Sequence, residues 1–188
     1  MNKVLDFRNF MVQYWVEEFP QLSKVSTLTA YETLDELQDI DSINTKKICI
    51  ELYLHKNANN YGLLGFEFNS KTNQKGLEVE IKYTDENTEH YQSKINKYDK
   101  TIYCGLTKEY VPYIKSRILD KIQKKNRFYN GTLIVSCAAN SEVGSSPMMF
   151  GLISDIIVEL FLRIQDKGNI DDCLKDTLYV CELIKEKY

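Results

Sequence analysis

The chain has 188 residues, with 24 Lys and Arg against 27 Asp and Glu, and therefore a net charge of −3. Its hydrophobic content of 43% and charged content of 27% are ordinary for a globular protein with one well-formed core. The acidic balance argues against a dedicated nucleic-acid binder, and no apolar run is long enough to span a membrane. The amino terminus lacks a signal-peptide core, so we expect a single cytoplasmic domain over residues 1–188, with no membrane partner.

Residues 1–45 are predicted to form an acidic N-terminal helical segment that covers a sheet. An apolar stripe at helical spacing stops at Pro20. Thr29 and Glu32 have the spacing of a capping box, which favours a second helix start. The stripe is mostly apolar and consists of Val4, Phe7, Met11, Tyr14, Trp15 and Glu18.

Between Lys46 and Tyr83 the apolar period changes to two, which is the period of a half-buried strand. Three strands are predicted here, joined by connections rich in turn-forming residues. Short connections favour antiparallel neighbours and a sheet with one solvated face. The alternating side chains are Ile48, Ile50, Leu52 and Leu54, then Leu64, Phe66 and Phe68, then Leu77, Val79, Ile81 and Tyr83.

The second half of the chain alternates helices with one strand. Residues 85–100 are polar, and we expect a helical or irregular excursion there. A helix follows, with Val111, Ile114, Ile118, Leu119 and Ile122 on one side and lysines on the other. An apolar strand is predicted over 132–138, entered through the turn signal Asn130-Gly131. Another helix ends at Gly168, and a last helix covers 169–188.

The loop at 141–150 leads into the second of these helices. Ser146 is predicted to cap the helix and Pro147 to occupy its first position. A Gly-Ser-Ser turn before a helix also offers free backbone N–H groups to a phosphate. The loop has a single glycine, lacks the G-x-x-x-x-G-K-[ST] pattern, and carries Glu142, which would repel an anion. We therefore interpret it as a capped helix start.

Neither metal chemistry nor covalent catalysis is favoured by the sequence. The five cysteines include no Cys-x-x-Cys pair, and the only imidazoles are His55 and His90, so neither a zinc cluster nor a disulfide framework is supported. A serine nucleophile at Ser145 or Ser146 would need a positioned base, and the two histidines lie elsewhere in the predicted elements. We expect no catalytic residue, no metal and no cofactor.

Residues 82–127 form a basic middle segment with 11 Lys and Arg against 6 Asp and Glu. Such a segment is suited to a polyanion. The same charges are also typical of one solvated helix and its flanking loops, and the sequence leaves both interpretations open.

Two segments of this half match a known pattern, in the order and at the separation that the pattern has. Gly105-Leu-Thr-Lys-Glu-Tyr-Val-Pro-Tyr-Ile-Lys-Ser-Arg-Ile118 is similar to G-x-x-x-E-Y-[IV]-P-x-[IV]-x-x-G-I. The loop at 141–150 is similar to H-D-V-D-S-S-E-x-A-F, with Val143, Ser145, Ser146 and Phe150 in register. A third similarity lies earlier in the chain, where Asn60-Tyr-Gly62 is similar to a Q-Y-G strand and Gly76-Leu-Glu-Val79 to a later K-G-[YF]-x-[FV] strand. Over residues 46–165 the chain thus resembles the fourth domain of elongation factor G and of the tetracycline-resistance ribosomal protection proteins.

The resemblance implies an α+β fold: a four-stranded, largely antiparallel sheet with two helices on one face, to which the N-terminal helical segment and the C-terminal helix are added. In the translocase this domain contacts transfer RNA and small-subunit RNA through its loop tips and performs no chemistry. The chain has no P-loop, so the resemblance implies a non-enzymatic binding module, with the ribosome or RNA as its partner.

Ten residues are the predicted contacts to such a partner. Four of them, Lys108, Asn140, Ser141 and Glu142, are expected at the distal end. Six basic residues are expected to contact phosphates, namely Lys115, Arg117, Lys121, Lys124, Lys125 and Arg127.

The chain departs from the family pattern where function would lie. Ser141, Glu142, Gly144 and Pro147 replace the histidine, two aspartates and glutamate of the family's loop, and Arg117 replaces a glycine. An alternative function is therefore a protein-interaction or regulatory module that uses the acidic N-terminal helices as its docking surface. In that case the aromatic residues of the segment, Phe10, Tyr14 and Trp15, either anchor a partner or pack against the chain's own sheet.

Overall fold

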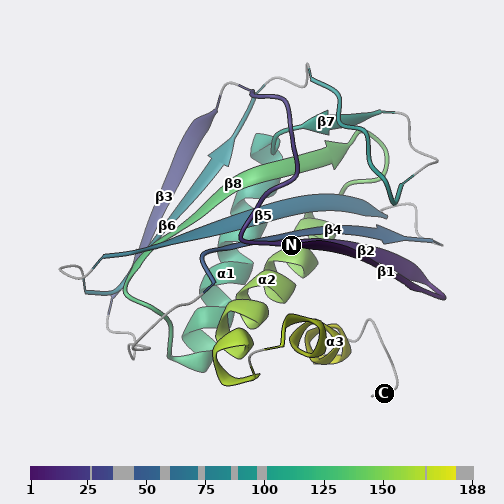
Figure 1. The fold of residues 1–188 in the computed structure, drawn as a ribbon. Helices are drawn as coiled ribbons and strands as arrows, with labels where there is room; N and C mark the ends of the chain where they lie inside the picture. The colour runs from purple at the N-terminus through teal and green to yellow at the C-terminus, as the bar shows by residue number, and fades with distance from the viewer. Residues whose placement is uncertain are drawn as a thin grey trace.

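The computed structural model describes residues 1–25, 27–35, 45–55, 60–71, 75–85, 89–96, 101–167 and 169–180. Within these ranges a large mixed sheet is covered on one face by helices (Figure 1). The strands are β1 (Asn2–Phe7), β2 (Phe10–Val16), β3 (Leu28–Leu34), β4 (Lys47–Leu54), β5 (Tyr61–Ser70), β6 (Leu77–Tyr83), β7 (Ile102–Cys104) and β8 (Gly131–Ser141). The helices are the short 3₁₀ helix η1 (Lys108–Tyr110), α1 (Val111–Lys125), α2 (Pro147–Lys167) and α3 (Ile170–Val180).

The strands of the sheet follow the order β1-β2-β4-β5-β8-β6-β3, and β7 pairs with the end of β8. Every pair is antiparallel except β6 with β8, which run parallel and are connected through β7 and α1. Residues 47–141 supply the four neighbouring strands β4, β5, β8 and β6. The N-terminal strands extend this group at both edges, β1 and β2 beside β4 and β3 beside β6.

The predicted four-stranded sheet is therefore wrong, because the described residues form one eight-stranded sheet. The predicted N-terminal helices are also wrong: β1 and β2 form a hairpin across Arg8 and Asn9, and Thr29 and Glu32 lie inside β3 rather than at a helix start. The part of this segment at 36–44 lies outside the described residues.

The physical reason for the error is burial on both faces of β2. Tyr14 faces the helices and is buried there, while the adjacent Trp15 is buried on the opposite face. A strand buried on both faces loses its alternation of apolar and polar residues, and its apolar positions can then match a helical spacing by chance.

The predictions for the second half of the chain are more accurate. The helix at Val111 and the strand that contains 132–138 are confirmed as α1 and β8. The helix at Pro147 is confirmed as α2, and Ser146 caps it, since its Oγ accepts a hydrogen bond of 3.2 Å from the N–H of Met149. The ends predicted at Gly168 and over 181–188 lie outside the described residues.

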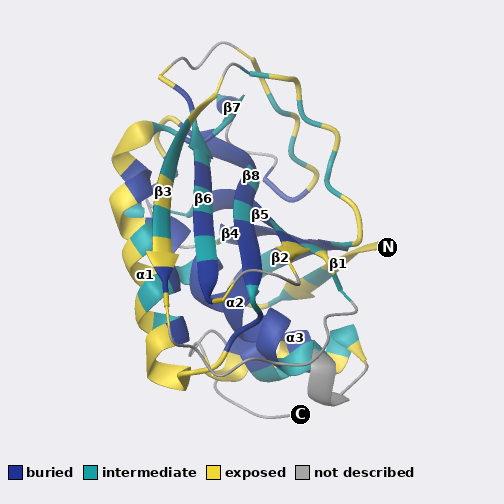
Figure 2. Cartoon of the chain, turned by 90° about the vertical axis from the view of Figure 1, so that its left-hand side faces the viewer, coloured by how far each residue is buried: buried dark blue, intermediate teal, exposed yellow. Residues whose placement is uncertain are grey.

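The main core lies between the sheet and the helices. It joins the inward side chains of the strands to one side of α1 and to most of α2, and Figure 2 shows α1 with a buried and an exposed side. α3 packs on α2, and the carboxylate of Asp171 at its start accepts hydrogen bonds from Lys3 and from the hydroxyl of Tyr14. No helix in the described ranges is long and apolar enough to cross a bilayer.

The opposite face of the sheet carries a smaller core, covered by segments without regular structure. Trp15, Tyr53, Tyr61 and Leu63 belong to this second cluster. Residues 89–96 are fixed to it by Glu51, a fully buried carboxylate that accepts hydrogen bonds from the hydroxyls of Tyr61 at 2.9 Å and Tyr91 at 3.3 Å. Burial raises the pKa of Glu51, although these hydrogen bonds oppose the shift.

Candidate functional site

The connection from β2 to β3 crosses the sheet from near one edge to the other. It is called the crossing segment below and comprises residues 17–25 and 27. Because β2 and β3 are separated by four strands, the segment passes over the face opposite the helices (Figure 1). Pro20, Ser23 and Thr27 are residue types that favour this irregular course.

Phe19 anchors the crossing segment to the middle of the sheet at Gly65. A Cβ atom on Gly65 would lie 2.9 Å from the Phe19 ring and 2.8 Å from the Cβ of Cys137, so only glycine leaves room for both. The ammonium of Lys47 lies 5.5 Å from the centroid of the same ring. A glycine within a strand therefore positions a segment that is remote in sequence.

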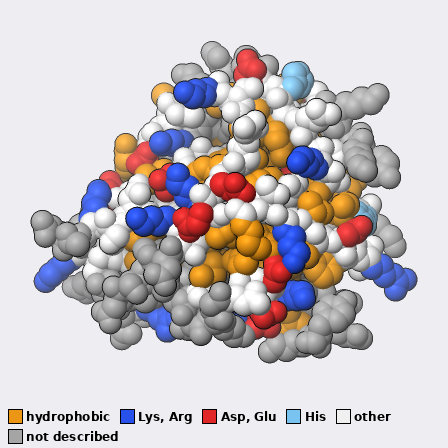
Figure 3. Space-filling view, viewed as in Figure 1, with side chains coloured by type: hydrophobic (Ala, Val, Ile, Leu, Met, Phe, Trp, Pro, Cys, Tyr) orange, Lys and Arg blue, Asp and Glu red, His pale blue; other side chains and the backbone are white. Residues whose placement is uncertain are grey.

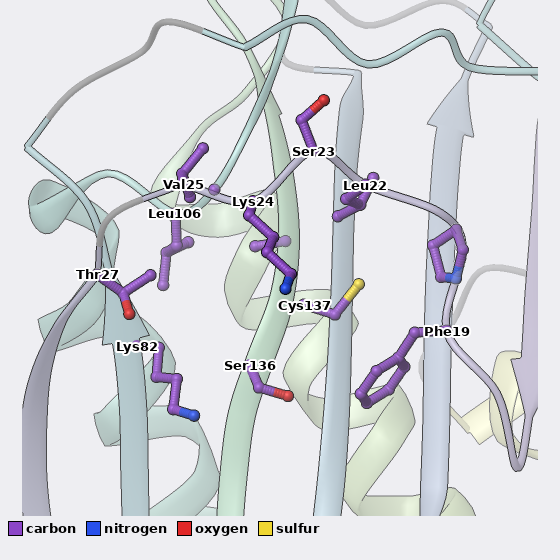
Figure 4. Close-up of a pocket in the computed structure, with 13 residues that line it drawn as sticks. Phe19, Leu22, Ser23, Lys24, Val25, Thr27, Lys82, Leu106, Ser136 and Cys137 are labelled. Atoms are coloured by element: carbon purple, nitrogen blue, oxygen red, sulfur yellow. The ribbon is translucent and has the colours of Figure 1, made fainter.

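Beyond this anchor the crossing segment and the sheet enclose a cavity of about 360 Å³ (Figure 4). The apolar residues that line it include Phe19, Leu22, Val25 and Leu106. Its other lining residues include Ser23, Lys24, Thr27, Lys82, Ser136 and Cys137. Figure 4 shows Lys24 running from the crossing segment toward β8 and Lys82 entering from β6.

The electrostatics of the cavity are set by these two ammonium groups. Lys82 lies 3.9 Å from Glu80 on its own strand, at the long end of the range for an ion pair. Lys24 makes no ion pair with any residue in the described part of the chain. Two positive charges with one distant counter-ion, beside the hydroxyls of Thr27 and Ser136, are suited to an anion.

Two buried thiols, Cys49 and Cys104, contact residues that line the cavity. Burial raises the pKa of Cys49, which hydrogen-bonds with Cys137. Burial also raises the pKa of Cys104, and hydrogen bonds with Ser23 only partly oppose this. These two thiols are therefore protonated at neutral pH and lack the properties of a nucleophile.

Polar groups of the loop at 141–146 form hydrogen bonds within the chain. The N–H of Ser141 donates to the Ser145 Oγ at 2.8 Å, and that hydroxyl donates to the carbonyl of Tyr61 at 2.9 Å. The N–H of Gly144 donates to the Ser141 Oγ at 2.9 Å. These hydrogen bonds and the Ser146 cap fix the conformation of the loop. The arrangement agrees with the interpretation of the loop as a capped helix start.

The four residues expected at the distal end divide into two pairs. Asn140 and Ser141 are buried, and the Asn140 side chain donates to the carbonyl of Gly105 at 3.0 Å. Lys108 and Glu142 are exposed. Only one pair of the four can therefore meet a partner directly.

Four of the six basic residues predicted to contact phosphate pair with acidic side chains instead. Lys115 lies 2.9 Å from Glu32, Lys121 lies 3.2 Å and Lys125 lies 3.9 Å from Glu159, and Arg117 pairs with Asp155. Lys124 and Arg127, near the end of α1, are exposed. On the open face of the sheet, basic and acidic side chains are also interspersed (Figure 3).

Two carboxylates of α2, those of Asp155 and Glu159, are buried beside these cations. Burial raises the pKa of Asp155, and Arg117 only partly compensates. Burial also acts to raise the pKa of Glu159, but the neighbouring Lys121 and the hydrogen bond from Arg163 outweigh it and hold that pKa below its usual range. The cations of α1 thus neutralise the Asp155 and Glu159 carboxylates of α2.

Comparisons of the chain with protein-family models, with curated proteins and with solved structures found no match. Within the described residues, no three His, Cys, Asp or Glu side chains are grouped in a way that could hold a metal ion. The resemblance to the translocase domain therefore depends on the matched sequence segments alone. The geometry of the described residues is the remaining guide to function.

Sequence reasoning missed the cavity because it assigned the crossing segment to a helical cover. The available signals were Pro20 followed by Ser and Thr residues, which is typical of a loop, and Gly65 inside an apolar strand, which indicates a close approach of another segment. Neither signal identifies the partner of Gly65. That Lys24 and Lys82 line one cavity follows from the order of the strands, which the sequence did not reveal.

Proposed function

We propose that this protein is a non-enzymatic binding protein whose ligand is a small organic anion with an apolar portion. The observation that carries the proposal is the arrival of Lys24 and Lys82, from two distant parts of the chain, in one cavity of about 360 Å³. That volume lies near the lower end of the range for small-molecule sites, about 300–1,000 Å³.

The polar and the apolar residues that line the cavity define the ligand class. The ammonium groups and the hydroxyls of Thr27 and Ser136 suit a carboxylate or a phosphate monoester, since charge-assisted hydrogen bonds are the strongest available there. The apolar residues, among them Phe19, Leu22 and Val25, suit a short hydrocarbon. Inorganic phosphate offers only the first set of contacts, and a neutral or cationic amphiphile offers only the second.

Calorimetric titration with four probes tests this proposal. We expect octanoate and octyl phosphate to bind, and the stronger of the two identifies the head group. Octyltrimethylammonium, which has the same chain and the opposite charge, should not bind, and inorganic phosphate should bind far more weakly. Replacing either lysine, as Lys24→Ser or Lys82→Ser, should weaken binding about tenfold or more, because each removes a charged hydrogen-bond donor.

Lys108→Ser is the matched control, because Lys108 is an exposed lysine that does not line the cavity. It should bind the octyl anions as the unmodified protein does. Equal binding of the cationic amphiphile, or unchanged affinity in a protein that carries both Lys24→Ser and Lys82→Ser, contradicts the proposal.

A ribosome- or RNA-binding role is a second proposal. It is supported by the adjacent strands β4, β5, β8 and β6 with the helices α1 and α2, which follow one another in the element order expected for the translocase domain. The exposed residues Lys108 and Lys124 are its candidate phosphate contacts. Its electrostatic basis is small, because four of the predicted basic contacts already pair with carboxylates.

Sedimentation with purified ribosomes at roughly 50 and 200 mM salt tests this second proposal, since affinity for phosphates falls steeply over that range. We expect weak co-migration at the lower concentration that is lost at the higher one, and a further loss in Lys124→Glu. Absence of co-migration at both concentrations, or co-migration that does not respond to salt, contradicts phosphate-directed binding.

A further inference from the structure

A second concave surface lies on the helical side of the sheet, away from the cavity under the crossing segment. It is a groove of about 450 Å³ between the first turns of α1 and α2, with the end of β4 beside them. Leu54, Met149 and Leu152 are among its apolar residues, and Tyr113, Arg117 and Met148 also line it.

The groove depends on two positions where the chain departs from the translocase pattern. Pro147 opens α2 beside the groove, and Arg117 crosses α2 at Gly151. A Cβ on Gly151 would lie 3.1 Å from the Cγ of Arg117, so the aliphatic part of Arg117 packs directly on the helix. Its guanidinium then reaches Asp155 one turn further along α2.

Large apolar side chains border the groove and remain in solvent. Met148 is 70% exposed and Tyr113 is 54% exposed, and both line the groove. Single exposed apolar residues are common, but a group around a concave surface is typical of an interaction site. Met, Tyr and Arg are also the residue types that are enriched at protein–protein interfaces.

The charges beside the groove indicate the character of the partner. The Arg117 side chain is 53% exposed, whereas its partner Asp155 is only 12% exposed. Lys121 and Lys124 also act on the Asp155 carboxyl. The Asp155 carboxylate is thus recessed and the Arg117 side chain faces outward, so a partner meets the positive charge of Arg117 at short range. Because one carboxylate already neutralises much of this charge, the surface suits one further acidic side chain better than a chain of phosphates.

We propose that this groove docks a partner protein through a segment that places a large apolar side chain between Tyr113 and Met148 and an acidic side chain against Arg117. The apolar contact would supply most of the affinity, because burial of the two exposed side chains removes them from water. The acidic contact would select the partner and its orientation. The inference is independent of the ligand in the other cavity.

Selection from a displayed library of random dodecapeptides provides the test. The bait is the full chain, with counter-selection against the double variant Tyr113→Ser/Met148→Ser. We expect the enriched peptides to share one Leu, Ile, Met, Phe or Trp with Asp or Glu a few residues away. In fluorescence polarisation, Met148→Ser should weaken binding of a synthesised enriched peptide about tenfold or more, as should replacing its acidic residue by Gln.

Tyr179→Ser is the matched control, because Tyr179 is an exposed aromatic residue on α3, outside the groove. It should leave the affinity unchanged. Three results overturn the proposal: no peptide that depends on Met148, enriched peptides that are basic, or a concentration-dependent dimer of the unmodified chain that Met148→Ser dissociates. The last result would assign the groove to a second copy of the chain. Met148 and Tyr113 are surface residues, so their substitution should leave thermal unfolding unchanged, and this is measured in parallel.

Discussion

Removal of residues 1–34 is expected to abolish folding. The deletion takes away β2, which lies inside the sheet and contributes Phe10, Tyr14 and Trp15 to buried positions. Truncation of a single buried aromatic residue costs about 3–5 kcal/mol. The summed cost of losing three of them is comparable to the roughly 5–15 kcal/mol by which the folded state of a typical domain is stable. The product should be insoluble, or should lack a cooperative transition in thermal unfolding followed by circular dichroism.

Removal of residues 1–7 alone is the matched control for this deletion. It deletes β1, an edge strand whose side chains are mostly exposed, together with the contact of Lys3 to Asp171. That protein should fold and melt cooperatively at a lower temperature. A soluble, cooperatively melting protein after removal of residues 1–34 would contradict the structure and would restore the interpretation of the segment as a separate docking element.

The N-terminal segment shows why the sequence predicted one half of this fold better than the other. α1 has one side to the core, so its apolar residues repeat at helical spacing. α2 is buried over most of its length, and its start carries recognisable signals, namely Ser146 and Pro147. β2 is buried on both faces and β3 is an exposed edge strand. Neither strand has the alternation that identifies a strand in isolation, and the sheet alone determines their structure.

The same distinction applies to the candidate sites. The sequence located the basic residues of α1 and the capped loop at 141–146, which are local features. It could not show that Asp155 and Glu159 neutralise those cations, or that Lys24 and Lys82 line the same cavity, because both facts depend on the packing of distant segments. A charge count over residues 82–127 includes the cations of α1 but omits the carboxylates of α2 that pack against them.

The Glu159 carboxylate makes this pairing measurable. Its side chain is 3% exposed, and it lies 3.2 Å from Lys121, 3.9 Å from Lys125 and 2.7 Å from Arg163. Loss of one partner from a buried ion pair leaves an uncompensated charge, so Glu159→Gln should cost about 3–5 kcal/mol of unfolding free energy in urea titrations at neutral pH. Glu67→Gln, which breaks the exposed contact to Lys47 at 3.7 Å, is the matched control and should cost less than about 1 kcal/mol.

The pH dependence of that difference is the more specific test. The fold lowers the pKa of Glu159, so the stability that this carboxylate contributes is complete above the usual glutamate pKa of about 4.3 and is lost as the pH falls toward the lower folded-state pKa. The difference in unfolding free energy between the unmodified protein and Glu159→Gln should therefore become smaller on acidification from pH 7. A gap that is no larger than that of Glu67→Gln, at any pH, would mean that the cations of α1 do not depend on Glu159. They would then be available to phosphates, and the case for RNA binding would gain the electrostatic basis that it lacks.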